Sequence, residues 1–187
     1  MPKVWTDTVE EHRRAVRDAA LDATAVLVAD HGLRSVTMGQ IAEATGISRA
    51  TLYRYFPDAD AILVAWHERQ VNRHLAHLTA VRDAHAVATE RLAAVLDAYA
   101  TILHEHHSTE GAAALHRGEH VARAQDSLAC FLADLISDAA VAGTVRSDIT
   151  AAELTSFTLN ALAAARTARS RAAARRLAVL VLAGLRP

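Results

Sequence analysis

Apolar residues recur along most of the chain at the three- and four-residue spacing of helices that bury one face. The first such segment covers residues 7–31, with Asp7 or Thr8 as its N-cap and Gly32 as its stop signal. Runs of alternating apolar and polar residues, which would indicate strands, are missing. The pattern predicts an all-α protein.

Two short helices are predicted after this first segment. Thr37 and Gln40 have the spacing of a capping box, in which each residue satisfies a backbone group of the other at a helix start. Gly46 suits a tight turn because glycine accepts a positive φ angle. Ser48 is a good N-cap for a third helix, which we expect over residues 48–55.

The rest of the chain is expected to form longer helices, giving about nine in all. A connecting helix follows Pro57 and Asp58, with an apolar stripe from Ile62 to Leu78. The later helices are predicted over residues 87–107, 120–142, 150–168 and 170–183. We divide the chain into residues 1–57 and residues 58–187.

The last two predicted helices are rich in alanine and carry apolar faces. Small side chains let helices approach closely, so these faces could pack against their own copies across a two-fold axis. The residues expected on them are Leu154, Phe157, Leu162, Leu177, Val181 and Leu185. The sequence therefore predicts a homodimer formed through the last two helices.

The two short helices have the dimensions of a helix-turn-helix, in which the second helix enters the major groove of DNA. The stretch from residue 37 to 63 closely resembles the TetR family of bacterial transcriptional regulators. The matching residues are Thr37, Ile41, Ala42, Gly46, Ile47, Ser48, Thr51, Leu52, Tyr53, Tyr55 and Phe56. The resemblance implies a three-helix DNA-binding head at residues 1–57 and a helical body at residues 58–187 for effector binding and dimerisation. It also implies a repressor that a small-molecule effector releases from a palindromic operator.

The same resemblance implies which residues meet double-stranded operator DNA. Arg49 would reach base edges, where a guanidinium can bond guanine at two atoms, and Ala50 could touch a thymine methyl. Phosphate or mixed contacts would come from Thr37, Ser48, Thr51, Tyr53, Arg54 and Tyr55. Two positions depart from the family pattern: Ala59 stands where a lysine often holds a phosphate, and Gly39 stands where a long polar side chain often reaches DNA.

Charge modifies this picture only locally. The formal net charge is -1, but residues 31–57 carry Arg34, Arg49 and Arg54 against Glu43 alone. A larger basic excess lies in residues 150–187, with six arginines and one acidic residue. A second nucleic-acid surface is one interpretation of that cluster. A solvated dimer rim, partly paired with Asp134 or Asp138, is the simpler one.

The effector is expected to be small and apolar or amphipathic, bound among the central helices. The candidate ligand-binding residues combine apolar surface with a few polar groups: Trp66, Tyr99, Leu103, Phe131 and Asn160. Each of them also fits an ordinary place in a core or an interface.

Eleven histidines raise the alternative of a metal sensor. His104, His106 and His107 are clustered, and His116 and His120 are spaced by four residues. Spacing alone is thin evidence, so we expect neither a metal nor another cofactor.

Other classes of protein are less well supported by the sequence. We find no nucleophile elbow and no glycine-rich phosphate loop, so an enzyme is not expected. A helical interaction module without DNA binding remains an alternative. One cysteine, no secretory signal and no apolar run long enough for a bilayer predict a cytoplasmic, nucleoid-associated protein with no membrane partner.

Overall fold

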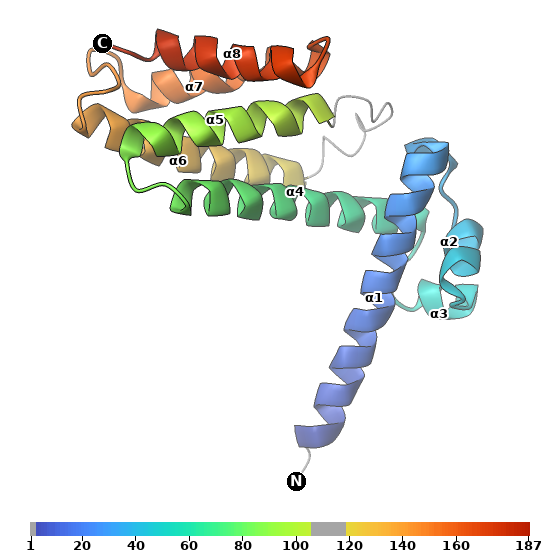
Figure 1. The fold of residues 1–187 in the computed structure, drawn as a ribbon. Coiled ribbons are helices and arrows are strands. Elements are labelled where there is room, and N and C mark those ends of the chain that lie inside the picture. Colours follow the sequence, from blue (N-terminus) through green and yellow to red (C-terminus); the bar gives the residue numbers. More distant parts are fainter. Residues whose placement is uncertain (1–2, 106–118) are drawn as a thin grey trace. The chain divides into compact units, whose positions relative to one another are not determined.

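A computed structural model describes residues 3–105 and 119–187 of the chain. Every regular element in these residues is helical, which confirms the all-α prediction, and eight α-helices stand against the nine or so expected (Figure 1). The elements are α1 (Lys3–His31), η1 (Leu33–Ser35), α2 (Met38–Thr45), α3 (Arg49–Tyr53), α4 (Ala59–Asp83), α5 (Ala88–Glu105), α6 (Glu119–Val141), α7 (Ala151–Ala163), η3 (Ala164–Thr167) and α8 (Arg171–Gly184).

Side-chain caps begin several of the helices. Thr37 and Gln40 form a capping box at the start of α2, and Thr150 and Glu153 form another at the start of α7. The hydroxyl of Ser170 accepts a hydrogen bond from the backbone of α8 in the same way. These side chains satisfy backbone N–H groups that have no partner within the helix, which defines where each helix begins.

Two helix boundaries differ from the prediction by four residues or more. Helix α1 begins at Lys3, ahead of the expected cap at Asp7 or Thr8, because residues 3–6 contain no glycine or proline to interrupt it. Helix α7 ends at Ala163 rather than near Ala168, and the chain continues as the 3-10 helix η3. Tightening of a last turn into a 3-10 helix is common and leaves no clear signal in a run of alanines.

The described residues pack as two units, one up to Gln70 and the other from Val71 onward. In the first unit, α2 lies against α1, and α3 lies against α2 (Figure 1). Its core includes Ala20, Ile41, Leu52, Phe56 and residues from the start of α4. Val9 of α1 is 55% exposed, whereas Val16 is buried. The buried face of this helix therefore begins at Val16, further along than the predicted helix start.

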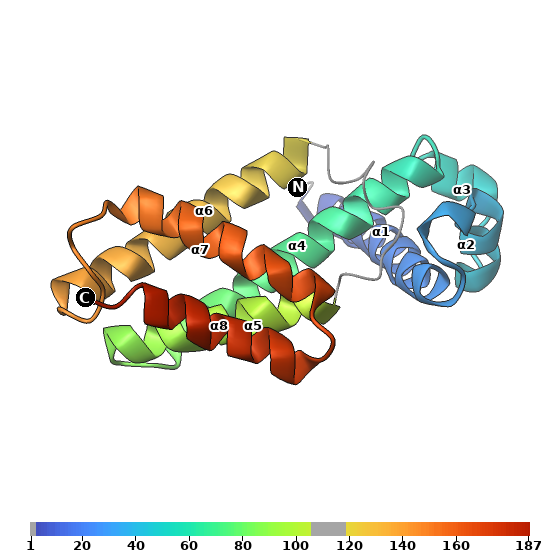
Figure 2. The same ribbon diagram turned by 90° about the horizontal axis from the view of Figure 1, so that it is seen from above.

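In the second unit, α5 lies alongside α8, and α6 alongside α7 (Figure 2). The core between them includes Leu92, Leu96, Leu132, Ile136 and Leu162, all fully buried. The end of α4 adds Leu78 to this core. Among the described residues, no helix is both long enough and apolar enough to cross a membrane.

Helix α4 belongs to both units, because the boundary between them falls within it. Ile62, Leu63 and Trp66 are buried in the core of the first unit, and Leu78 is buried in the second. The boundary between the two packed units thus lies inside α4. The boundary that we predicted between the DNA-binding head and the body lies before α4, at residue 57.

Most of the residues predicted for the apolar dimer face on the last two helices do not lie on the surface, so this part of the prediction is wrong. Leu154, Leu162, Val181 and Leu185 are buried in the core of their own unit, and Leu177 is partly buried against it. These residues follow the helical period, but that period marks the core face. Only Phe157 of the predicted set is exposed.

A different apolar strip is exposed on α7 and α8. Phe157 is 48% exposed, Val179 65% and Leu180 67%. A Cβ placed on Gly184 would lie 3.5 Å from Cζ of Phe157, so the phenyl ring lies over this glycine and joins the surfaces of the two helices. We call Phe157, Val179, Leu180 and Gly184 the α7–α8 strip.

Candidate nucleic-acid interface

Two capped helices and a glycine turn make up the candidate interface. The side chain of Thr37 accepts a hydrogen bond from the backbone N–H of Gln40, and Oε1 of Gln40 accepts one from the backbone N–H of Thr37 at 2.9 Å. Gly46 ends α2 with a φ of 70°, in the left-handed region that favours glycine. Ser48 Oγ accepts a hydrogen bond from the N–H of Thr51 at 3.1 Å and starts α3.

Apolar residues fix this helix pair to α1. Ile41 and Leu52 are fully buried and Phe56 is 3% exposed, while Ile47 is half-buried at the edge of the same core. The guanidinium of Arg17 on α1 lies 4.7 Å from the centre of the Phe56 ring, a cation–π contact. One face of α2 and α3 is therefore used for packing.

Most of the residues expected to meet DNA lie outside this core, whereas Tyr55 is partly buried against it. Thr37, Ser48, Arg49, Ala50, Tyr53 and Arg54 are exposed, and Thr51 and Tyr55 are half-buried. The hydroxyls of Thr37 and Ser48 already take part in caps, so their first role is to shape the helix starts. The structure brings all eight residues together on this pair of helices and the turns beside it. Their individual contacts with DNA remain predictions.

Arg49 and Gly39 are neighbours in space. A Cβ placed on Gly39 would lie 2.5 Å from Nη2 and 3.2 Å from Cζ of Arg49, so the guanidinium lies across the bare backbone of α2. The glycine that departs from the family pattern at residue 39 is thus the residue on which the Arg49 guanidinium packs. The missing side chain leaves the space that Arg49 fills.

Family models match the chain over nearly all of its length. The model for the tetR family of bacterial regulatory proteins matches residues 20–66, which contain α2 and α3. The model for the C-terminal domain of SbtR-like transcriptional regulators matches residues 49–187. The chain belongs to the TetR family.

Individual relatives agree with this membership. The TetR transcriptional regulator SCO0520 from Streptomyces coelicolor is 31% identical, with a TM-score of 0.63 over 91% of this chain and 98% of that chain. The transcriptional regulator FadR from Bacillus subtilis, solved in complex with stearoyl-CoA, is 15% identical and has a TM-score of 0.68 over 89% of this chain and 96% of that chain. An uncharacterised HTH-type transcriptional regulator of Mycobacterium tuberculosis is 43% identical over 56 residues, which are 30% of this chain and 28% of the relative.

The five candidate ligand residues do not form one cluster in this TetR-family chain. Trp66 is buried in the core of the first unit, whereas the other four lie in the second. Leu103 is buried, Tyr99 and Phe131 are partly buried against the same core, and Asn160 is exposed and donates a hydrogen bond to the backbone oxygen of Ser156. Burial raises the pKa of the Tyr99 phenol above its ordinary value. Ligand binding by any of the five remains a prediction.

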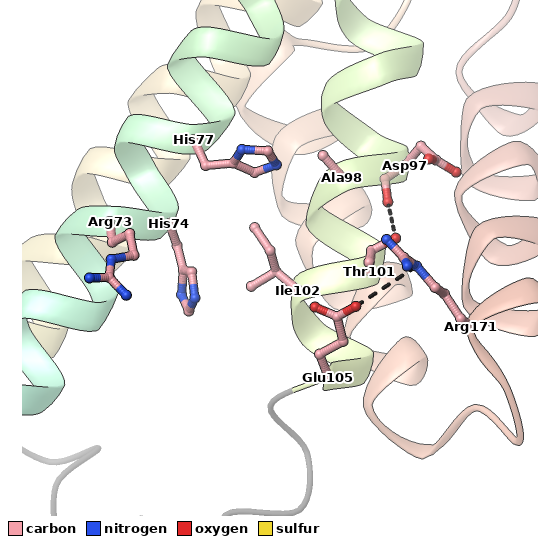
Figure 3. A pocket seen from close by; sticks show the side chains of 9 residues that line it. All are labelled: Arg73, His74, His77, Asp97, Ala98, Thr101, Ile102, Glu105 and Arg171. Atoms are coloured by element: carbon pink, nitrogen blue, oxygen red, sulfur yellow. Dashed lines mark hydrogen bonds and ion pairs between the residues drawn. The ribbon is translucent and has the colours of Figure 1, made fainter. Parts of the chain in front are cut away.

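A pocket of about 470 Å³ lies in the second unit, and none of the five candidates lines it (Figure 3). Its walls are formed by α4, α5 and the start of α8. The lining residues are Arg73, His74, His77, Asp97, Ala98, Thr101, Ile102, Glu105 and Arg171. The sequence reasoning missed this pocket because most of its residues are polar and they come from three separate helices.

The arginines near the C-terminal end pair with different acids from those expected. Nε of Arg175 donates to Oδ1 of Asp97 at 2.8 Å, and Arg171 lies 3.8 Å from Glu105. Asp138 instead faces Arg91 at 3.8 Å. Arg171 and Arg175 therefore pair with acids of α5 rather than with Asp134 or Asp138, because α8 lies against α5. Pairing of the other four arginines at a dimer rim stays a prediction.

Most of the clustered histidines lie outside the residues that the structure describes. His106, His107 and His116 lie beyond the described residues, so the metal-sensor alternative stays an untested hypothesis. Within residues 3–105 and 119–187, no group of three histidine, cysteine or acidic side chains could hold a metal ion.

Replacing Gly46 with alanine is expected to destabilise the first unit by about 1–2 kcal/mol, because a Cβ is strained at positive φ. The added Cβ would meet no atom within 4 Å, so backbone strain is the only cost. Urea unfolding followed by tryptophan fluorescence measures this effect, since both tryptophans lie in the first unit.

Gly46→Asn is the matched control for this measurement. Asparagine tolerates the left-handed conformation better than alanine, so its loss of stability should be smaller. An alanine variant as stable as the unchanged protein would contradict the turn geometry.

Proposed function

We propose that this TetR-family chain is a homodimeric repressor that leaves a palindromic operator when a small molecule binds its C-terminal helices. The observation that carries the proposal is the exposed row on α2 and α3, with Arg49 and Arg54 beside Tyr53, on a pair of helices fixed from behind by a buried core. That row has the size and chemistry needed for the major groove and its flanking phosphates.

In this proposal Arg49 reads base edges. It is exposed at the first turn of α3 and has no ion-pair partner in the described residues, so its guanidinium is available for guanine O6 and N7. Contact with Gly39 restricts where the guanidinium can go. Tyr53 and Arg54, both exposed at the end of α3, are assigned to the DNA backbone.

The α7–α8 strip supports the dimer. Three large apolar side chains exposed on two adjacent helices are unusual for a surface that stays in water. A two-fold axis through the strip would bring the same residues of two copies together, as a closed dimer requires. Dimerisation in turn supplies the two reading heads that a palindrome needs.

Release by an effector is the last part of the proposal. An effector lowers operator affinity only by as much as it prefers the conformation that binds DNA poorly. The Bacillus subtilis neighbour was solved with stearoyl-CoA, which supports a small apolar or amphipathic effector for a body of this fold. The polar pocket on α4, α5 and α8 is a second place where such a molecule could bind.

Selection of random duplexes by the purified protein tests the proposal as a whole. We expect an inverted repeat with half-sites one helical turn apart, or a multiple of it, at about 34–36 Å per turn. Enrichment of a single half-site would contradict the dimer, and the absence of any enriched sequence would contradict operator binding.

Arg49→Ala is expected to cost about 1–3 kcal/mol of affinity for the selected duplex and to relax the preference at one base position per half-site. The reason is the loss of a two-atom contact with one base. Fluorescence anisotropy titrations on selected and scrambled duplexes measure both effects. Arg123→Ala, an exposed arginine on α6, is the matched control and should bind as the unchanged protein does.

A second variant changes Gly39, the residue against which the Arg49 guanidinium packs. Gly39→Ala should displace the Arg49 guanidinium while favouring the helix, so a weaker complex cannot be blamed on unfolding. The two substitutions should be strongly non-additive, because the alanine at residue 39 has nothing to displace once Arg49 is gone. Equal losses on selected and scrambled duplexes, or additive effects, would argue against Arg49 as the base reader.

Leu180→Glu is expected to convert the dimer into a monomer, because two buried carboxylates would meet across the axis without partners. Sedimentation velocity on the purified protein measures the mass. Val141→Glu is the control, since Val141 is 92% exposed at the end of α6, outside the α7–α8 strip. A Leu180→Glu protein that stays dimeric would place the interface elsewhere.

A further inference from the structure

The pocket on the second unit has two walls of different chemistry (Figure 3). Helix α4 contributes three basic side chains, Arg73, His74 and His77, and the imidazole ring of His77 extends toward α5. Helix α5 contributes the apolar residues Ala98 and Ile102 as well as polar groups. The α4 and α5 backbones lie further apart than those of α5 and α8, which leaves room for a ligand.

The acidic groups of the α5 wall are already paired. The Asp97 carboxylate accepts hydrogen bonds from Nε of Arg175 at 2.8 and 3.0 Å. Glu105 lies 3.8 Å from Nε of Arg171. The Thr101 hydroxyl donates to the backbone oxygen of Asp97 at 3.0 Å. These groups therefore have little attraction left for a cationic ligand.

Arg73 on the opposite wall differs in this respect. Its side chain is exposed and forms no hydrogen bond or ion pair in the described part of the chain. A guanidinium offers a planar pair of N–H donors that matches a carboxylate, and His77 stands one turn further along the same helix. The pocket thus has an unpaired cation on one side and apolar side chains on the other.

We propose that this pocket binds a small organic acid, with its carboxylate on Arg73 beside His77 and its apolar part along Ala98 and Ile102. The volume lies within the range of pockets that hold ligands of drug size. This inference rests on the proposed function, because it names the chemical class of the effector.

The position of Arg73 also offers a route to the first unit. Arg69, one turn earlier on α4, lies 2.7 Å from Asp22 and 3.9 Å from Asp18 of α1. Residues 69, 73 and 77 share one face of α4 because they are four apart. An acid that holds Arg73 therefore acts on the same helix face that is fixed to α1.

Calorimetric titration of the full chain without DNA tests the site directly. The probes are three acids and their uncharged amides: 2-naphthoate with 2-naphthamide, indole-3-acetate with indole-3-acetamide, and octanoate with octanamide. We expect at least one acid to bind about tenfold or more tightly than its amide, as charge-assisted hydrogen bonds allow. Arg73→Gln should remove most of that advantage.

Arg123→Gln is the matched control, because Arg123 is exposed on α6 and does not line the pocket. Circular dichroism melts of both variants show that folding is unchanged. The inference is overturned if no acid binds, if acids and amides bind equally, or if Arg73→Gln binds acids as well as Arg123→Gln does.

An acid that binds through Arg73 but leaves the selected duplex in place supports the site and contradicts the proposed release. An uncharged effector that releases the duplex independently of Arg73 overturns the inference and leaves the repressor intact.

Discussion

The packing of α2 and α3 onto α1 is the interaction on which the rest of the account depends. Ile41 and Leu52 are fully buried beside Phe56, and this core decides which face of each short helix points outward. Truncating a buried residue of this size costs about 2–5 kcal/mol, which is at least comparable with the value of a single base contact. The recognition surface is thus a consequence of the core behind it.

Local signals made the first unit predictable from the sequence. The cap at Thr37, the turn at Gly46 and the cap at Ser48 each depend on residues within a few positions of one another, and all three are formed as expected. The helical period found the buried residues, but it could not tell a core face from an interface. For that reason Leu154, Leu162, Val181 and Leu185 were assigned to the dimer although they form the core.

The second unit depends on which helices become neighbours, and a single sequence carries little of that information. The arginines of α8 meet Asp97 and Glu105 because α8 lies on α5, a pairing across 78 residues for Arg175 and Asp97. The pocket follows from the same arrangement. The exposure of Phe157 and Leu180 could likewise be recognised only from the structure, which shows which apolar residues of α7 and α8 are buried in the core.

The central claim is that the exposed face of α2 and α3 is the surface that holds DNA. Hydrogen–deuterium exchange of the full chain, with and without a selected duplex, tests it most directly. The account predicts slower exchange over residues 37–56 when the duplex is bound, centred on the two helix starts. Protection confined to residues 150–187, where six arginines stand against one acidic residue, would contradict it.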